Sequence, residues 1–157
     1  VYANYVTNNR DPFGFFGYVT GDIQRIRLTQ VDLTATSTAL GIDQRGGLIG
    51  RLLDGSLLQS SISGSVTFVG KDGFADWGGV VGELGGSAKV AETFGNLQVS
   101  FKSTGSTYDT SRYLGGFAGF MDGGTRIEDS YLIGSVTLES DTRVSTSQGP
   151  QAFVARS

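Results

Sequence analysis

The glycine-rich segment GGLIG at residues 46–50 recurs twice, as GGVVG at residues 78–82 and as GGFAG at residues 115–119. A looser copy, GFFG, stands at residues 14–17, and AFVA at residues 152–155 matches the opening of another copy. Equivalent positions in these copies are 33, 32, 37 and 36 residues apart: Gly14, Gly47, Gly79, Gly116 and Ala152. Such regular self-similarity indicates an internal repeat, and the repeat decides the fold.

Each copy ends in a short strand with two apolar residues around a polar one. These strands are VDL at 31–33, VTF at 66–68, VSF at 99–101 and VTL at 136–138. Because successive side chains of a strand point to opposite faces, the apolar pair is predicted to face inward. The polar residues are then expected to form one outward column: Asp32, Thr67, Ser100 and Thr137.

A unit of this length with short strands cannot bury its own apolar face, whereas stacked copies can. The sequence therefore predicts an all-β fold, a right-handed parallel β-solenoid of about four coils, with repeats of about 32–37 residues. The expected repeats are 12–45, 46–77, 78–114 and 115–151, followed by a partial repeat at 152–157. Residues 1–11 are expected to be the tail of a preceding strand or a linker.

The two ends of the predicted solenoid carry neither an amphipathic helix nor a charged edge strand. Arg156 is the only charged residue in the last partial repeat. Since open sheet edges pair with any strand that reaches them, natural solenoids usually close their ends. We expect these ends to pair with other copies or with neighbouring repeats of a longer array.

Composition excludes several classes of function. Glycine supplies 25 of the 157 residues, and histidine and cysteine are absent. Disulfides, thiolate metal sites and Ser–His or Cys–His catalytic dyads are therefore excluded within these residues. The net charge of −3, with its signs scattered, disfavours nucleic acid as a partner. No apolar run reaches the length of a membrane span.

The repeat resembles the GLUG repeat, whose signature is GGLVG followed by an isoleucine, a Ser-Tyr pair and Gly-x-Val. Residues 115–119 fit it together with Ile127, Ser130-Tyr131 and the stretch 134–136, whereas the third copy departs at Thr93-Phe94 and Leu97. The resemblance, which covers about residues 12–157, implies large surface or secreted proteins of bacteria and archaea. These include adhesins and regions beside immunoglobulin-cleaving metalloproteases. It implies an extracellular or cell-surface location and no catalytic residues.

Chemistry-bearing residues are few. Asp54 and Asp122 precede glycine at matching turns, where aspartate is ordinary turn chemistry. Asp72, Asp76 and Asp109 lie in loops that could offer oxygens to calcium, but no calcium-binding motif accompanies them. We therefore expect no metal and no cofactor. Enzymes built on parallel β-helices gather carboxylates and basic residues along one groove, and no such cluster recurs between repeats. The chain is expected not to be an enzyme.

Aromatic residues between the repeats are the best binding signal. Phe74 and Trp77 fall in one expected loop, and Tyr108 and Tyr113 in another. Such rings suit a glycan or a host protein, because aromatic residues are enriched at interfaces. In the alternative, favoured interpretation, Trp77 and Tyr113 cap the core just before each glycine pair. The sequence thus predicts a structural, adhesin-type or filament-type module, with a carbohydrate-binding or carbohydrate-cleaving β-helix as the alternative.

Overall fold

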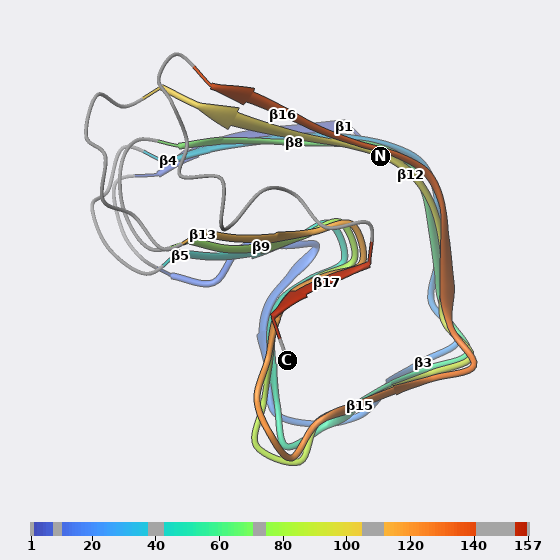
Figure 1. Ribbon diagram of the computed structural model, residues 1–157. Helices are drawn as coiled ribbons and strands as arrows, with labels where there is room; N and C mark the ends of the chain where they lie inside the picture. Colours follow the sequence, from blue (N-terminus) through green and yellow to red (C-terminus); the bar gives the residue numbers. More distant parts are fainter. Residues whose placement is uncertain are drawn as a thin grey trace.

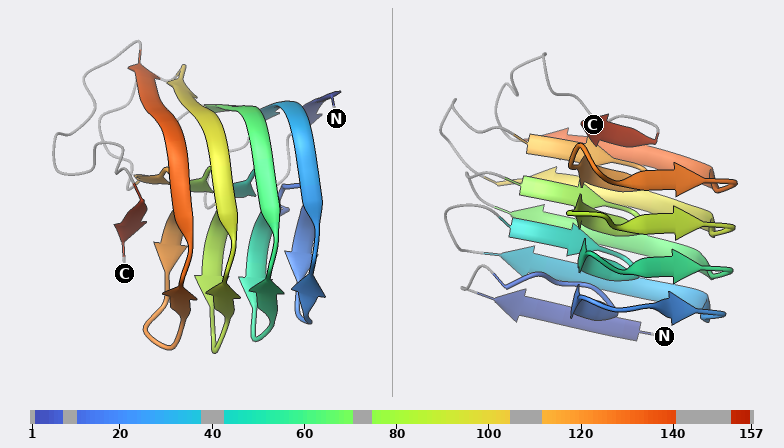
Figure 2. Two further views of the ribbon diagram at one scale, coloured as in Figure 1. Left: turned by 90° about the vertical axis from the view of Figure 1, so that its right-hand side faces the viewer. Right: turned by 90° about the horizontal axis from the view of Figure 1, so that it is seen from below.

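The chain forms a parallel β-solenoid. The computed structural model describes residues 2–7, 11–37, 43–70, 75–104, 112–140 and 153–156, and all regular structure within them is β-strand. Figure 1 looks along the solenoid axis, and the chain runs anticlockwise there while it approaches the viewer, so the solenoid is right-handed. Figure 2 shows successive turns lying side by side. The predicted fold class is confirmed.

Three turns of the described chain contain four strands each. The first of them has β5 (Asp43–Gly46), β6 (Ile49–Leu53), β7 (Ser56–Leu58) and β8 (Ser61–Gly70). The next has β9 (Ala75–Gly78), β10 (Val81–Gly85), β11 (Lys89–Ala91) and β12 (Phe94–Ser103). The third has β13 (Arg112–Gly115), β14 (Ala118–Met121), β15 (Arg126–Glu128) and β16 (Tyr131–Ser140).

Partial turns flank these three. Ahead of them stand β1 (Tyr2–Thr7), β2 (Phe16–Val19), β3 (Ile23–Gln24) and β4 (Arg27–Ser37), and β17 (Val154–Arg156) follows them. Equivalent strands of successive turns pair in parallel and build four sheets. Their orders are β1-β4-β8-β12-β16, β17-β14-β10-β6-β2, β15-β11-β7-β3 and β13-β9-β5. The β1-β4-β8-β12-β16 sheet bends and forms the right-hand and upper sides in Figure 1, and each of the other three sheets forms one side.

The predicted pairing of equivalent residues is observed in the three four-stranded turns but not in β4. Val66 pairs with Val99 and Val99 with Val136, as expected. In β4, however, Leu33 pairs with Val66, and Thr34 rather than Asp32 joins the outward column of Thr67. A β-bulge between Leu28 and Val31, where β4 contains one more residue than β8, accounts for one of the two residues of this shift. The inward face is unaffected, since Val31 and Leu33 are buried and Asp32 is exposed.

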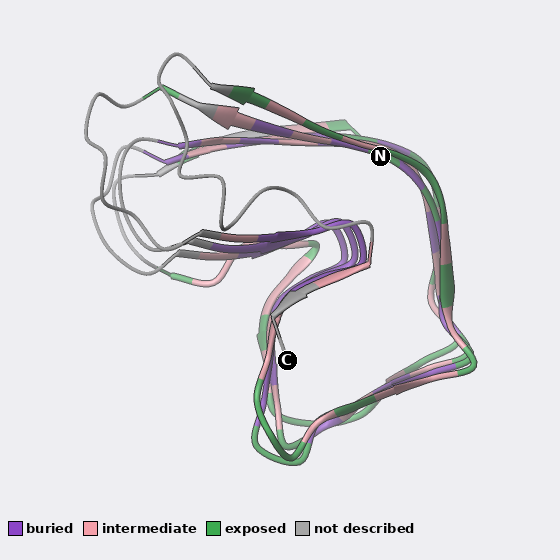
Figure 3. Ribbon diagram, viewed as in Figure 1, coloured by how far each residue is buried: buried purple, intermediate pink, exposed green. Residues whose placement is uncertain are grey.

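The core lies inside the solenoid and at the bend between the β5-β9-β13 and β6-β10-β14 sides (Figure 3). Leu48, Val80 and Phe117 form the predicted column there and are fully buried. The column continues to Phe153, whose ring stacks on Phe117 with centroids 4.8 Å apart. A Cβ atom on Gly79 would collide with the carbonyl oxygen of the glycine one turn on, so the tight bend requires glycine.

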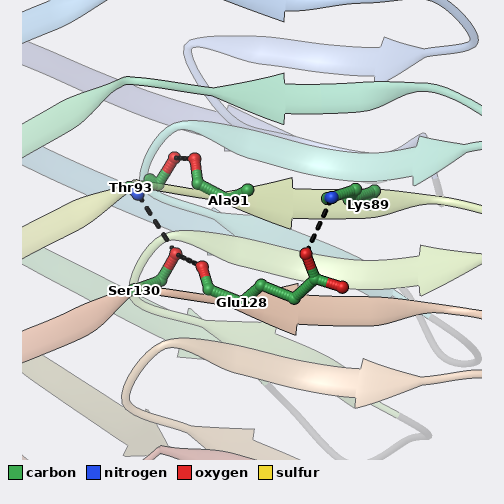
Figure 4. A network of polar contacts seen from close by, with 5 residues as sticks. All are labelled: Lys89, Ala91, Thr93, Glu128 and Ser130. Atoms are coloured by element: carbon green, nitrogen blue, oxygen red, sulfur yellow. Dashed lines mark hydrogen bonds and ion pairs between the residues drawn. The ribbon is translucent and has the colours of Figure 1, made fainter.

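A second corner, between the β7-β11-β15 and β8-β12-β16 strands, is held by hydroxyl groups (Figure 4). The corner residue has a positive φ, such as 51° at Glu92 and 45° at Asp129. Ser130, which follows Asp129, donates its hydroxyl to the Glu128 carbonyl at 2.7 Å and accepts the Thr93 backbone N–H at 3.1 Å. One hydroxyl thus satisfies polar backbone groups of two turns, and the Ser or Thr of the repeat is a structural residue.

Candidate functional site

Trp77, a candidate for ligand binding that was also expected to cap the core, is buried. Its side chain is only 3% exposed. The rings of Phe68 and Phe101 lie with their centroids 6.0 and 6.1 Å from that of Trp77, and the Arg45 guanidinium carbon is 4.9 Å away. The indole is thus enclosed between strands of different turns, in agreement with the packing interpretation of Trp77.

Tyr113, another predicted aromatic, does not join Trp77 in a site. Tyr113 pairs in register with Asp76, the neighbour of Trp77, so it lies on the opposite face of the same sheet. It is half-buried, and its ring packs against Phe120 with centroids 5.8 Å apart. Phe74 and Tyr108 lie outside the described residues.

The structure exposes a different group of apolar side chains, on the outer face of β12 and β16. Phe94, Tyr131 and Ile133 are 37%, 50% and 59% exposed, and we call them the outer-face patch. The two aromatic rings lie against each other with centroids 4.6 Å apart. The exposure of Phe94 could have been predicted from the alternation of side chains along β12. Because Leu97 and Val99 point inward, Phe94 must point outward.

A shallow depression of about 460 Å³ adjoins this patch on the same outer face. We call it the amide groove, after the two amide side chains that line it, Asn96 and Gln98. These stand on β12, with Ser63 and Gly64 on β8 at one side and Gly134 and Ser135 on β16 at the other. Leu97 completes the lining. Gln98 lies between Ser65 and Ser135, whereas Asn96 lies between Ser63 and Ile133 of the outer-face patch. No charged residue lines the groove.

The aspartates that precede glycine accept hydrogen bonds from backbone N–H groups. Asp54 accepts a hydrogen bond from the Ser87 backbone N–H at 2.9 Å, and Asp122 accepts one from the Gly123 N–H at 2.8 Å. They do not occupy equivalent positions, since Asp54 follows the partner of Gly85 whereas Asp122 follows the partner of Leu84. Within the described ranges, no three His, Cys, Asp or Glu side chains gather where a metal ion could be held.

Acidic and basic side chains are paired between neighbouring turns. Glu83 on β10, which is 8% exposed, meets Arg51 on β6 at 3.0 Å. Burial raises the pKa of the Glu83 carboxyl, and this outweighs the opposing effects of Arg51 and of a hydrogen bond from Gln44. At the surface, Lys89 meets Glu128 at 2.7 Å (Figure 4), and their hydrogen bond lowers the pKa of Glu128.

Comparisons of the chain with models of protein families, with curated proteins and with solved structures found no match. In the part of the chain that the structure describes, no helix is long and apolar enough to cross a membrane. Function therefore has to be argued from the geometry of this solenoid.

Proposed function

We propose that the chain is a non-enzymatic structural module of the GLUG type, which displays loops outside the cell or at its surface and stacks end to end. This module would serve an adhesin or a filament. The observation that supports the proposal most strongly is the incomplete burial of apolar side chains in the two outer turns. They continue the inward apolar columns of the central turns, but their side chains are only partly covered.

The incomplete cover is clear at the C-terminal side. Val66 and Val99 are fully or almost fully buried, whereas Val136, next in the same column, is half-buried. Phe101 is likewise buried and its partner Leu138 half-buried. Among the described strands, none pairs with the outer edge of β16. One further turn would bury these side chains and pair this edge, as it does inside the solenoid.

The N-terminal side is open in the same way. Ile49, Leu52 and Leu57 are fully buried, whereas their partners one turn earlier are half-buried: Phe16, Val19 and Ile23. The outer edge of β2 has no partner among the described strands. Because the two ends are related by a shift along the axis, joining one to the other repeats the internal contact. Such a head-to-tail contact extends into a filament instead of closing a ring.

Two further observations support a module without catalytic turnover outside the cell. The carboxylates of Asp54 and Asp122 bind turn N–H groups, and those of Glu83 and Glu128 are paired with Arg51 and Lys89, so all four have structural partners. The location rests on the resemblance to surface and secreted proteins carried by the repeated glycine segments.

Sedimentation velocity over a range of protein concentrations tests the stacking. We expect growing head-to-tail species, and Val136→Lys should abolish them, because it places a charge on the contact surface at a half-buried position. Thr137→Lys, one residue along and outward, is the matched control and should still associate. A wild-type monomer at high concentration, with the amides of β2 and β16 protected from hydrogen exchange, would overturn the proposal.

A further inference from the structure

The outer-face patch and the amide groove form one continuous surface that the stacking proposal does not use. Both lie on the outward face of the strands β8, β12 and β16, whereas stacking would use the free edge of β16. We propose that this surface is a binding site for a neutral glycan, held by stacking on the Phe94–Tyr131 pair and by hydrogen bonds to the groove.

The aromatic pair supplies the stacking element. Phe94 and Tyr131 keep 37% and 50% of their surface exposed although they pack on each other. The next residue of their column is Ser61 on β8, whose side chain is too small to cover an aromatic ring. Aromatic rings offer a flat apolar surface with negative charge on the face, which suits the C–H groups of a sugar ring. The pair therefore provides a platform beside the groove.

The groove supplies the hydrogen-bonding element. The side chains of Asn96 and Gln98 are exposed and make no hydrogen bond to the described residues. Each amide offers donors and an acceptor, and each neighbouring serine hydroxyl can do both. Sugar hydroxyls also donate and accept, so this set of groups matches them. A volume of about 460 Å³ falls within the ~300–1,000 Å³ range of ligand sites.

The charges around the surface favour a neutral ligand. Asp32 pairs in register with Ser65, beside the groove, and accepts its hydroxyl at 3.4 Å. Further along β12 and β16, Lys102 and Glu139 neutralise each other at 3.0 Å. Arg27 stands two strands from Phe94 and beyond the groove lining. An anionic polysaccharide would thus find no cation in the groove, and a cationic ligand no carboxylate.

A panel of immobilised oligosaccharides tests the inference with the whole chain. We use neutral gluco-, galacto-, manno- and xylo-oligosaccharides beside uronic-acid oligosaccharides. Binding is expected to members of the neutral set alone, with shifts of the Asn96 and Gln98 side-chain amide signals in NMR spectra. Absence of binding to every neutral member, or binding to the uronic acids alone, would overturn it.

Substitutions then locate the site. Phe94→Ala with Tyr131→Ala, and separately Asn96→Ala with Gln98→Ala, should each weaken binding about tenfold or more. The controls are Tyr18→Ala, an aromatic 50% exposed on β2, and Ser100→Ala, on the same face of β12; both should bind like the wild type. Unchanged affinity in both double variants would contradict the site. Their sedimentation should match the wild type, so failure here is distinct from failure of the stacking proposal.

Discussion

β12 in the centre of the solenoid and β16 in the outermost complete turn have almost the same inward pattern but differ in burial. Val99 and Phe101 are at most 1% exposed, whereas Val136 and Leu138, their partners in register, are half-buried. The two strands share an alternation, and only β12 has a described neighbour on both sides. Alternation thus decides which face a side chain takes, and the neighbouring turn decides how completely it is covered.

The largest expected effect comes from a charge placed on the inward face of a central strand. Val66→Asp should lower the free energy of unfolding by more than about 4 kcal/mol, because it buries a carboxylate without a partner. Val136→Asp, in the same column, should cost about 2 kcal/mol or less, since the carboxylate there can reach water. Urea unfolding followed by circular dichroism measures both.

Thr67→Asp is the control, because Thr67 neighbours Val66 and points outward; its effect should stay within about 1 kcal/mol. Equal losses at Val66 and Val136 would show that the outermost turn is as well covered as the central one. Equal tolerance at Val66 and Thr67 would refute the alternation itself.

Substitutions of two glycines compare a position enclosed by the neighbouring turn with a position that faces open space. A Cβ on Gly79 would collide with the carbonyl oxygen of Gly116 and would lie 2.6 Å from Val99 Cγ2, so Gly79→Ala should cost about 3 kcal/mol. Gly123 stands in an outer turn with nothing within 4 Å of such an atom, and Gly123→Ala should change stability by less than about 0.5 kcal/mol. Thermal melting measures the stability of the two variants. Similar shifts in melting temperature would mean that the backbone at the bend can move to accommodate a Cβ atom.

The smallest expected effect is a pH dependence that originates at Glu83. Burial raises its pKa above 4.5, so between 4.5 and that higher value the folded chain binds more protons than the unfolded chain. The contribution of this carboxyl to stability therefore falls as pH rises through that window. Compared with Glu83→Gln, the wild type should gain in melting temperature as pH is lowered from 7 towards 4.5. A difference between the two that stays constant with pH would contradict this.

Much of the architecture could be predicted from the residues alone. The spacing of the glycine segments predicted the stacked turns, and the alternation in 66–68 and 99–101 predicted which side chains face inward. The register of β4 was wrong by two residues, because VDL at 31–33 imitates the pattern of VTF at 66–68. An error of two residues leaves no trace in such a pattern, because side chains alternate with a period of two and the same residues still face inward.

The candidate site was harder to predict. The position of Trp77 just before a glycine pair leaves it either exposed or capping the core, and only its packing against Phe68 and Phe101 decides for the core. Phe94 and Tyr131 were recognised as repeat positions but not as an exposed pair, although the alternation already placed Phe94 outward. The amide groove could not be predicted, because it depends on residues of three turns lying side by side.

The sequence by itself determined the period, the strand class and the face that each side chain takes, because these follow from repetition and from the two-residue alternation of a strand. The tertiary structure alone decided which residues become neighbours across turns. Arg45 shows the difference: it is fully buried because its guanidinium donates to the carbonyls of Ala35 at 2.8 Å and Val69 at 3.0 Å, which β4 and β8 bring to it. No local pattern predicts these acceptors, since they are 10 and 24 residues away along the chain and meet the arginine only once the chain has folded.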